Sequence, residues 1–197
     1  MDNTIISYDN LLCKLGIEKQ YISPDTPKNK KVIRDKVRQL HDGEIKWQKL
    51  QGLLYGPLII QADLINGVTE FIQMAHQHQC QVFIVSHKTQ YSRYDHTKTN
   101  LRDASLLWMG RHNFFDKSHL GLKKNNIFFE NSRSEKVKRI SMLKCTYFID
   151  DLEETFLEQS FPKHISKILY SPFSNKQVDG VTVIQNWKSI RFHIFGL

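Results

Sequence analysis

The sequence lacks several features that would place the chain in a special class of protein. Its three cysteines, Cys13, Cys80 and Cys145, are far apart and lie in apolar surroundings. This pattern argues against a disulfide framework or a zinc site and predicts reduced, mostly packed thiols. No apolar run approaches the roughly 20 residues that are needed to span a bilayer, so we expect no membrane partner.

The N-terminal residues also lack the basic and then apolar pattern of a signal peptide, so we expect a cytoplasmic protein. Repeats and low-complexity tracts are not evident. With 40% hydrophobic and 24% charged residues, the 197-residue chain suits one globular core with a small inserted subdomain. Its net charge of +8 favours anionic partners, but charge alone does not choose among phosphorylated metabolites, nucleic acid and membrane surfaces.

The densest basic run lies in an expected amphipathic helix from Lys28 to Leu40. Val32, Ile33 and Val37 have helical spacing there, which indicates that one side of the helix packs and the other is solvated. The run contains no aromatic residue on which a base could stack, so we do not expect a nucleic-acid partner.

Short apolar runs alternate with helix-length segments along most of the chain. We expect strands at 4–8, 80–85, 126–129, 147–149, 167–170 and 181–184, and helices at 28–40, within 41–60, and at 62–78, 100–112 and 134–143. A short helix is expected after Glu154, and residues 187–195 are expected to form a terminal helix or a tail. This alternation predicts an α/β fold with a doubly wound parallel sheet. The helical region 13–60 directly follows the first strand and is predicted to form a small cap, with residues 1–12 and 61–197 as the core.

Two adjacent carboxylates, Asp150 and Asp151, follow an apolar run that suits a buried parallel strand. Ligands bind at this edge of open α/β sheets, and neighbouring carboxylates there are costly unless a cation or a hydrogen-bond network takes up their charge. The pair is therefore a candidate Mg²⁺ site. The alternative is a solvated turn in which Asp151 caps the next helix, with Glu154 three residues later.

Other polar residues occupy the corresponding ends of two earlier strands. Ser7 to Asn10 closes the first strand, and Ser86-His87-Lys88-Thr89 closes the strand that starts at Cys80. Lys136 lies near the start of the helix that leads into the acidic pair. We expect these two strand ends to converge at one edge of the sheet with Asp150-Asp151 and with Lys136 just upstream of that pair.

In this order the motifs resemble those of the haloacid dehalogenase-like phosphohydrolase superfamily. That superfamily places Asp-x-Asp after its first strand, Ser or Thr after its second, Lys before its fourth and an acidic pair after its fourth. The matching residues here are Ser7-Tyr8-Asp9-Asn10-Leu11-Leu12, Ser86, Lys136 and Asp150-Asp151. The resemblance extends from about Thr4 to Tyr170.

The resemblance implies a Mg²⁺-dependent phosphohydrolase that acts on a small phosphorylated substrate. Asp150, Asp151 and the main-chain carbonyl of Asp9 would hold the metal, which neutralises charge between an anionic nucleophile and an anionic substrate. Asp9 would also act as the general acid and base. The remaining roles fall to Ser86 and Lys136, which would hold the phosphoryl group, and to His87 and Lys88, which would line the substrate pocket.

The sequence departs from the superfamily at the first motif, where Ser7 takes the place of the nucleophilic Asp. Serine is a poor nucleophile without a nearby base, and it supplies no carboxylate for Mg²⁺. Taking Asp9 as the nucleophile instead leaves Leu11 where the general acid should be. The Asp-Asn-Leu-Leu run favours the first alignment. Either ordinary turnover is lost while phosphate binding is kept, or Ser7 acts in a way that the sequence does not reveal.

The stretch from Phe83 to Pro172 also resembles a bacterial subgroup of this superfamily whose members tend to accompany surface-polysaccharide biosynthesis. Two alternatives to a phosphohydrolase stay open at this point. The chain could be a catalytically inactive binding or regulatory module whose cap holds a protein partner. A weaker alternative, suggested by the positive charge, is a phosphatase or binder of nucleic-acid ends.

Overall fold

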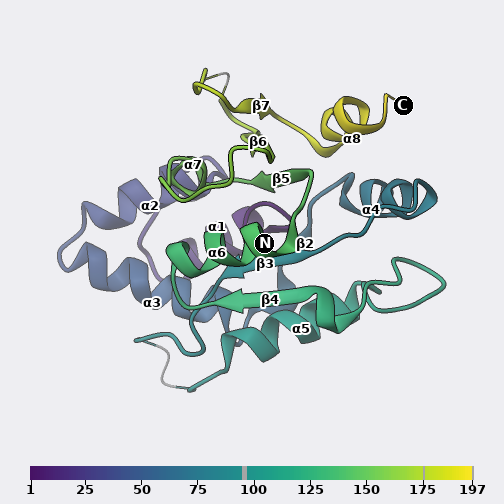
Figure 1. Cartoon of the computed structure of the whole chain (residues 1–197). Coiled ribbons are helices and arrows are strands. Elements are labelled where there is room, and N and C mark those ends of the chain that lie inside the picture. The colour runs from purple at the N-terminus through teal and green to yellow at the C-terminus, as the bar shows by residue number, and fades with distance from the viewer. Residues whose placement is uncertain (95–96, 175, 197) are drawn as a thin grey trace. The chain divides into compact units, whose positions relative to one another are not determined.

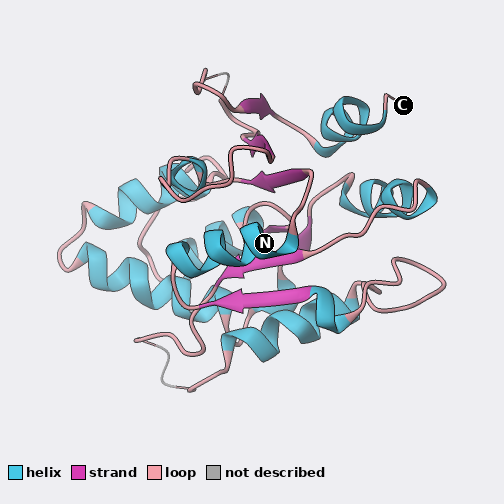
Figure 2. Cartoon of the chain, in the orientation of Figure 1, coloured by secondary structure: helices cyan, strands magenta, loops and turns pink. Residues whose placement is uncertain are grey.

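The computed structural model describes residues 1–94, 97–174 and 176–196, which form a mixed α/β structure (Figures 1 and 2). Its helices are α1 (Asp9–Glu18), α2 (Lys30–Arg38), α3 (Gly43–Tyr55), α4 (Val68–Gln77), α5 (Leu101–Arg111), α6 (Arg133–Leu143), α7 (Glu153–Phe156) and α8 (Trp187–Phe195), with short 3₁₀ helices η1 (Ile59–Gln61) and η2 (Lys124–Asn126). Its strands are β1 (Ile6–Ser7), β2 (Asp63–Leu64), β3 (Ile84–His87), β4 (Ile127–Glu130), β5 (Tyr147–Asp150), β6 (Ser166–Tyr170) and β7 (Thr182–Ile184). Within these residues, no helix combines the length and the apolar character that crossing a membrane requires.

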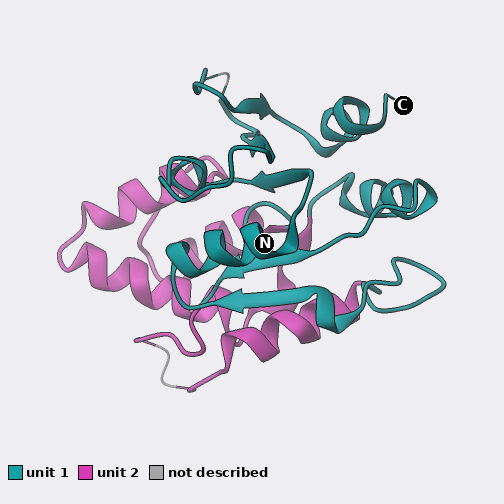
Figure 3. Cartoon of the chain, in the orientation of Figure 1, with its two compact units in different colours: residues 1–5, 65–88, 113–197 teal, residues 6–64, 89–112 magenta. Residues whose placement is uncertain are grey.

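The chain divides into two compact units (Figure 3). Unit 1 comprises residues 1–5, 65–88 and 113–197, and it contains strands β3 to β7. Unit 2 comprises residues 6–64 and 89–112, and it contains strands β1 and β2 together with helices α1, α2, α3 and α5.

The strands of unit 1 are parallel, as the sequence predicts. β3 pairs with β4, and β5, β6 and β7 pair in that order. In this register Ser86 lies opposite Phe129, and Asp150 lies opposite Leu169. The α/β class is thereby confirmed at the level of small parallel sheets, while the doubly wound arrangement stays a prediction.

Helix α6 connects β4 to β5 and supplies part of the core of unit 1. Its buried residues Val137 and Ile140 join a cluster with Val85 of β3 and Leu169 of β6, and three further members are Phe156, Phe161 and Ile165. Burial of such side chains stabilises each by about 1.5–3 kcal/mol. Lys136 directly precedes Val137, so the packing of α6 also fixes the position of the Lys136 main chain.

Unit 2 is a group of packed helices. α2 packs against α3, α1 contacts both of them, and α3 also contacts α5. The side chain of Asn29 caps α2 by accepting hydrogen bonds from the main-chain nitrogens of Lys31 and Val32. Ile33 and Val37 are the buried residues of α2, as their helical spacing predicts. Residues 13–60 are therefore largely helical, and the role of this region as a cap stays a prediction.

Most of the other predicted elements are present with shifted ends. The helix expected from Ala62 begins only at Val68, because Ile59–Gln61 and Asp63–Leu64 form other elements and Gly67 adopts a left-handed φ of 89°. The strand expected at 80–85 occupies Ile84–His87 instead. Cys13 is buried and Cys145 is partly buried, but Cys80 is exposed just after α4, so the expectation of mostly packed thiols is wrong for that residue.

The first predicted strand, from Thr4 to Tyr8, is only partly correct. Residues 3–5 form a turn, in which the Ile5 nitrogen donates to the Met1 carbonyl over 2.8 Å and Asn3 has a φ of 57°. Asn tolerates this left-handed conformation, so the turn outweighs the strand propensity of the β-branched run. Only Ile6–Ser7 is extended, and it pairs antiparallel with β2 rather than joining a parallel sheet.

Candidate functional site

Asp150 and Lys136, both predicted site residues, form a buried ion pair in unit 1. Asp150 ends β5 and is 3% exposed, while Lys136 lies in the first turn of α6 and is 4% exposed. Asp150 Oδ1 also accepts a hydrogen bond from the Leu152 nitrogen over 3.0 Å. The start of α6 is fixed by the Ser132 side chain, which accepts from the Glu135 nitrogen over 3.2 Å. The strand end and the helix start thus place opposite charges side by side.

Asp151 is held by the N-terminal segment of the chain. Thr4 Oγ1 donates to Asp151 Oδ1 over 2.9 Å, and Asn3 Nδ2 donates to Asp151 Oδ2 over 3.3 Å. Leu152, and not Asp151, is the N-cap residue of α7, and no side chain caps that helix. The alternative in which Asp151 serves as a helix cap is therefore wrong.

A second buried lysine lies just after β3. Lys88 Nζ contacts Asp2 Oδ1 at 3.0 Å, and the lysine side chain is almost fully buried. The main-chain nitrogen of Lys88 donates to the carbonyl of Glu130 over 2.9 Å, which continues the pairing of β3 with β4. Lys88 was predicted to line a substrate pocket, and its partner Asp2 was not among the predicted residues.

These contacts converge at the N-terminal segment. Burial lowers the pKa of the Met1 amino group and Lys136 lowers it further, while the carboxylates of Asp150, Asp2 and Asp151 raise it. In Figure 1 the N-terminus lies between β3 and β5, in agreement with the contacts to the residues after each strand. We call Asp2, Lys88, Lys136, Asp150 and Asp151 the carboxylate–lysine cluster.

Two other predicted residues lie on β3 next to this cluster. Ser86 is buried in the strand. His87 ends it and is exposed to solvent on one side. Partial burial lowers its pKa, as do the charges of Lys136 and Arg133, against a smaller opposing effect of an Asn131 main-chain hydrogen bond and of Glu135. At neutral pH this environment favours the uncharged imidazole.

Ser7 and Asp9 belong to unit 2, and each has a partner within that unit. Ser7 pairs with Asp63 in the antiparallel ladder of β1 and β2. Asp9 Oδ1 accepts a hydrogen bond from the main-chain nitrogen of Lys30 over 2.9 Å, at the start of α2. Burial raises the pKa of Asp9, and the Lys30 main-chain bond and charge oppose that shift. Asp9 therefore has a structural role at the start of α2, and its predicted catalytic role stays a prediction.

Sequence reasoning missed Asp2, Asn3 and Thr4, which the structure brings to the acidic pair. The available signal was a repeat of the Asp-Asn dipeptide, which occurs at Asp2-Asn3 and again at Asp9-Asn10. Only the second occurrence was matched to a motif, because the first lies ahead of the expected strand.

The oxygen donors of the acidic pair suit Mg²⁺. Among the described residues, no group of three or more His, Cys, Asp or Glu side chains is arranged to hold a metal ion. Mg²⁺ is usually held by only one or two carboxylates together with water and substrate phosphate, so Asp150 and Asp151 fit its chemistry. Asp150 would have to share its charge between the ion and Lys136.

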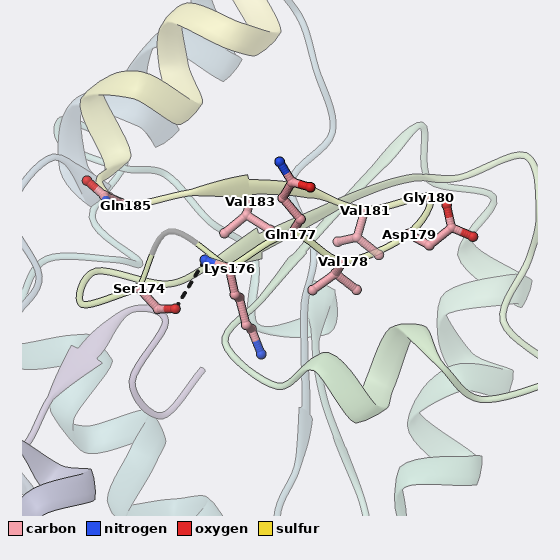
Figure 4. A pocket seen from close by; sticks show the side chains of 9 residues that line it. All are labelled: Ser174, Lys176, Gln177, Val178, Asp179, Gly180, Val181, Val183 and Gln185. Carbon is pink, nitrogen blue, oxygen red and sulfur yellow. Dashed lines mark hydrogen bonds between the residues drawn. The ribbon is translucent and has the colours of Figure 1, made fainter.

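A hollow of about 640 Å³ lies elsewhere in unit 1, between Ser174 and Gln185 (Figure 4). It contains none of the predicted site residues. The Ser174 hydroxyl accepts a hydrogen bond from the Lys176 nitrogen over 3.2 Å, and Lys176 forms an ion pair with Glu153. The polar side chains of this hollow include no concentration of like charges, so the candidate site is the carboxylate–lysine cluster.

In comparisons with known proteins, no family model matches the chain, and no curated protein or solved structure is significantly similar to it.

Proposed function

We propose that the chain is a Mg²⁺-dependent phosphohydrolase-type protein that binds a small phosphorylated metabolite at the carboxylate–lysine cluster. In this proposal unit 1 belongs to a doubly wound, haloacid dehalogenase-like core, and residues 13–60 form its cap. The observation that carries the proposal is the buried contact of Lys136 with Asp150, the residue before Asp151, and all three charges act on the Met1 amino group.

The charges of the cluster support a phosphate site. Buried carboxylates and lysines are costly unless they are paired or bind ions, and such clusters concentrate at functional sites. Asp150 and Asp151 would hold Mg²⁺, which when bound reduces the repulsion between an anionic substrate and the carboxylates. Lys136 and Ser86 would bind the phosphoryl oxygens, and Lys136 would exchange part of its contact with Asp150 for the substrate.

Two carboxylates are candidates for the general acid and base of the proposed reaction. Asp9 is favoured by the sequence match, and Asp2 is favoured by its position in unit 1 beside Lys88 and next to the segment that contacts Asp151. We propose Asp2 for this role.

The test is a phosphate-release assay with MgCl₂, p-nitrophenyl phosphate and a panel of sugar and nucleotide phosphates. If Asp2 transfers the proton, Asp2→Asn should lower turnover by at least about 100-fold. Asp9→Asn, which can still accept the bond from the Lys30 nitrogen, should change turnover far less. Lys88→Met is the control, because it breaks the same ion pair but keeps the carboxylate. Turnover that survives Asp2→Asn and Asp9→Asn together would contradict the proposal, and so would calorimetry that finds neither Mg²⁺ nor phosphate binding.

The second candidate is a catalytically inactive binding module, which the serine at position 7 favours. Ser7→Asp separates the two candidates when no activity is detected in the unmodified protein. A gain of phosphatase activity would indicate that the remaining groups are competent. Continued inactivity together with retained phosphate binding would favour the binding module.

A further inference from the structure

Trp187, the first residue of α8, is clamped in the core of unit 1. Its side chain is 4% exposed. Its ring packs edge-on against Phe71 of α4, with 4.9 Å between ring centroids, and it lies 6.2 Å from the ring of Tyr170 at the end of β6. The position of the indole is therefore determined by two other elements.

Gly67 completes this clamp. Its φ is 89°, and a Cβ atom built there would lie 2.8 Å from the Cβ of Trp187. Such a distance is shorter than any ordinary carbon–carbon contact, so a residue without a side chain is required beside the tryptophan. The close approach leaves the indole little freedom to shift.

The clamped indole is connected to the acidic pair by two successive hydrogen bonds. Trp187 Nε1 donates to the Thr4 carbonyl over 2.8 Å in a buried bond between residues 183 positions apart. Thr4 is 3% exposed, and its Oγ1 donates to Asp151 Oδ1 over 2.9 Å. A β-branched side chain has few χ1 choices, so fixing the threonine backbone also fixes the direction of its hydroxyl group.

We infer that Trp187 and Thr4 are positioning residues for Asp151. Through them, helix α8 would influence the affinity of Asp150 and Asp151 for Mg²⁺. The inference rests on the proposed function in that it takes Asp151 as a metal ligand. Neither residue touches the cation. The indole holds the turn of residues 3–5 in place, and the threonine hydroxyl then orients the carboxylate.

The test compares Trp187→Phe with a matched control in unit 2. Trp187→Phe keeps an aromatic ring against Phe71 and removes only the N–H donor. The control is Trp108→Phe, because Trp108 is buried as well and its Nε1 donates to the Ala62 carbonyl over 2.9 Å. Calorimetric titration with MgCl₂ should give roughly 2- to 10-fold weaker binding for Trp187→Phe, the range expected for one net hydrogen bond, and unchanged binding for Trp108→Phe.

Thr4→Val tests the second bond, because valine has nearly the same shape and lacks the hydroxyl group. It should weaken Mg²⁺ binding at least as much as Trp187→Phe. The double variant should be no weaker than Thr4→Val alone, since both substitutions interrupt one connection. Additive losses would mean that the two residues act separately, and this would overturn the inference.

Hydrogen–deuterium exchange without metal tests the inference separately from the proposed function. Trp187→Phe should speed exchange of the main-chain amides in residues 3–5 and at Asp151 and Leu152, whereas Trp108→Phe should not. Unchanged exchange at these positions, or unchanged Mg²⁺ affinity, would overturn the positioning role. If the unmodified protein binds no Mg²⁺, the proposed function fails, and the exchange experiment still decides whether Trp187 positions Asp151.

Discussion

At the scale of single residues, the buried ion pair between Lys136 and Asp150 combines a structural and a chemical role. Each partner satisfies the charge of the other inside unit 1. Removal of one partner from a buried pair leaves an uncompensated charge, which is the main reason that such substitutions are severe. The same pairing places an ammonium group beside the acidic pair, where the proposed substrate would bring its phosphate.

We predict that Lys136→Met lowers the free energy of unfolding by about 3–5 kcal/mol. Urea unfolding followed by circular dichroism measures this change. Lys138→Met is the control, because Lys138 is exposed on the same helix and its substitution should change stability by no more than about 0.5 kcal/mol. Equal effects of the two substitutions would contradict the account of a stabilising buried pair.

His87 should make stability depend on pH near neutrality. Its pKa is lowered from the ordinary value of 6.5 by burial and by the charges of Lys136 and Arg133. The unfolded chain therefore binds a proton on His87 more readily than the folded chain does, and the free energy of unfolding should fall as the pH drops below 6.5. His112, whose pKa is also lowered by burial and by Arg111, should contribute in the same direction.

Urea unfolding of His87→Gln at a series of pH values checks this expectation. The variant should lose stability less steeply than the unmodified protein as the pH falls from about 7 to about 5, and the contribution of His112 should remain. A pH dependence identical to that of the unmodified protein would show that the surroundings of His87 do not disfavour its protonation.

At the scale of elements, the start of α4 and the start of α8 meet at Gly67 and Trp187. The glycine is required twice, once for its left-handed φ and once for the space that Trp187 fills. Packing of these two helix starts is therefore connected to the carboxylate–lysine cluster through the Thr4 carbonyl.

Gly67→Ala should be more destabilising than Gly180→Ala. Gly180 also has a left-handed φ, 65°, but a Cβ there would meet nothing within 4 Å, so its substitution adds backbone strain alone, worth about 1 kcal/mol. The contact with Trp187 should add roughly 1–3 kcal/mol for Gly67→Ala. Thermal and urea unfolding of both variants measure the difference, and equal losses would mean that the site relaxes to accept the methyl group.

At the scale of the whole molecule, the positive charge tests the nucleic-acid alternative. On α2, Arg34 pairs with Asp35 and Arg38 with Glu44, so part of the densest basic run is already neutralised within unit 2. We predict weak binding of single-stranded oligonucleotides in fluorescence anisotropy. Tight binding that falls steeply between about 50 and 200 mM salt would instead support the nucleic-acid alternative.

Local patterns predicted those features that depend on neighbouring residues. The spacing of Ile33 and Val37 predicted α2, and the apolar run before Asp150 predicted β5. Polar residues at the carboxyl ends of parallel strands share one edge of the sheet. This rule predicted that Lys136 lies close to Asp150, because α6 leads directly into β5. These inferences needed only chain order and periodicity.

The segment 1–5 could not be predicted in this way, because its conformation depends on distant partners. Thr4 contacts Asp151 through its side chain and Trp187 through its carbonyl, and no periodic pattern encodes either contact. The strand propensity of the residues from Thr4 onward therefore predicted an extended first strand, whereas the structure has a turn. Asp2 was missed because it lies ahead of the expected first strand.

The most direct test of the central claim is calorimetric titration of MgCl₂ into the unmodified protein, Asp151→Asn and, as a control, Asp179→Asn, whose side chain is exposed beside the hollow of Figure 4. If the acidic pair after β5 is a cation site, the unmodified protein and Asp179→Asn should bind one Mg²⁺ with equal affinity, and Asp151→Asn should bind at least about 10-fold more weakly. Equal binding by all three proteins, or no binding by the unmodified protein, would contradict the account.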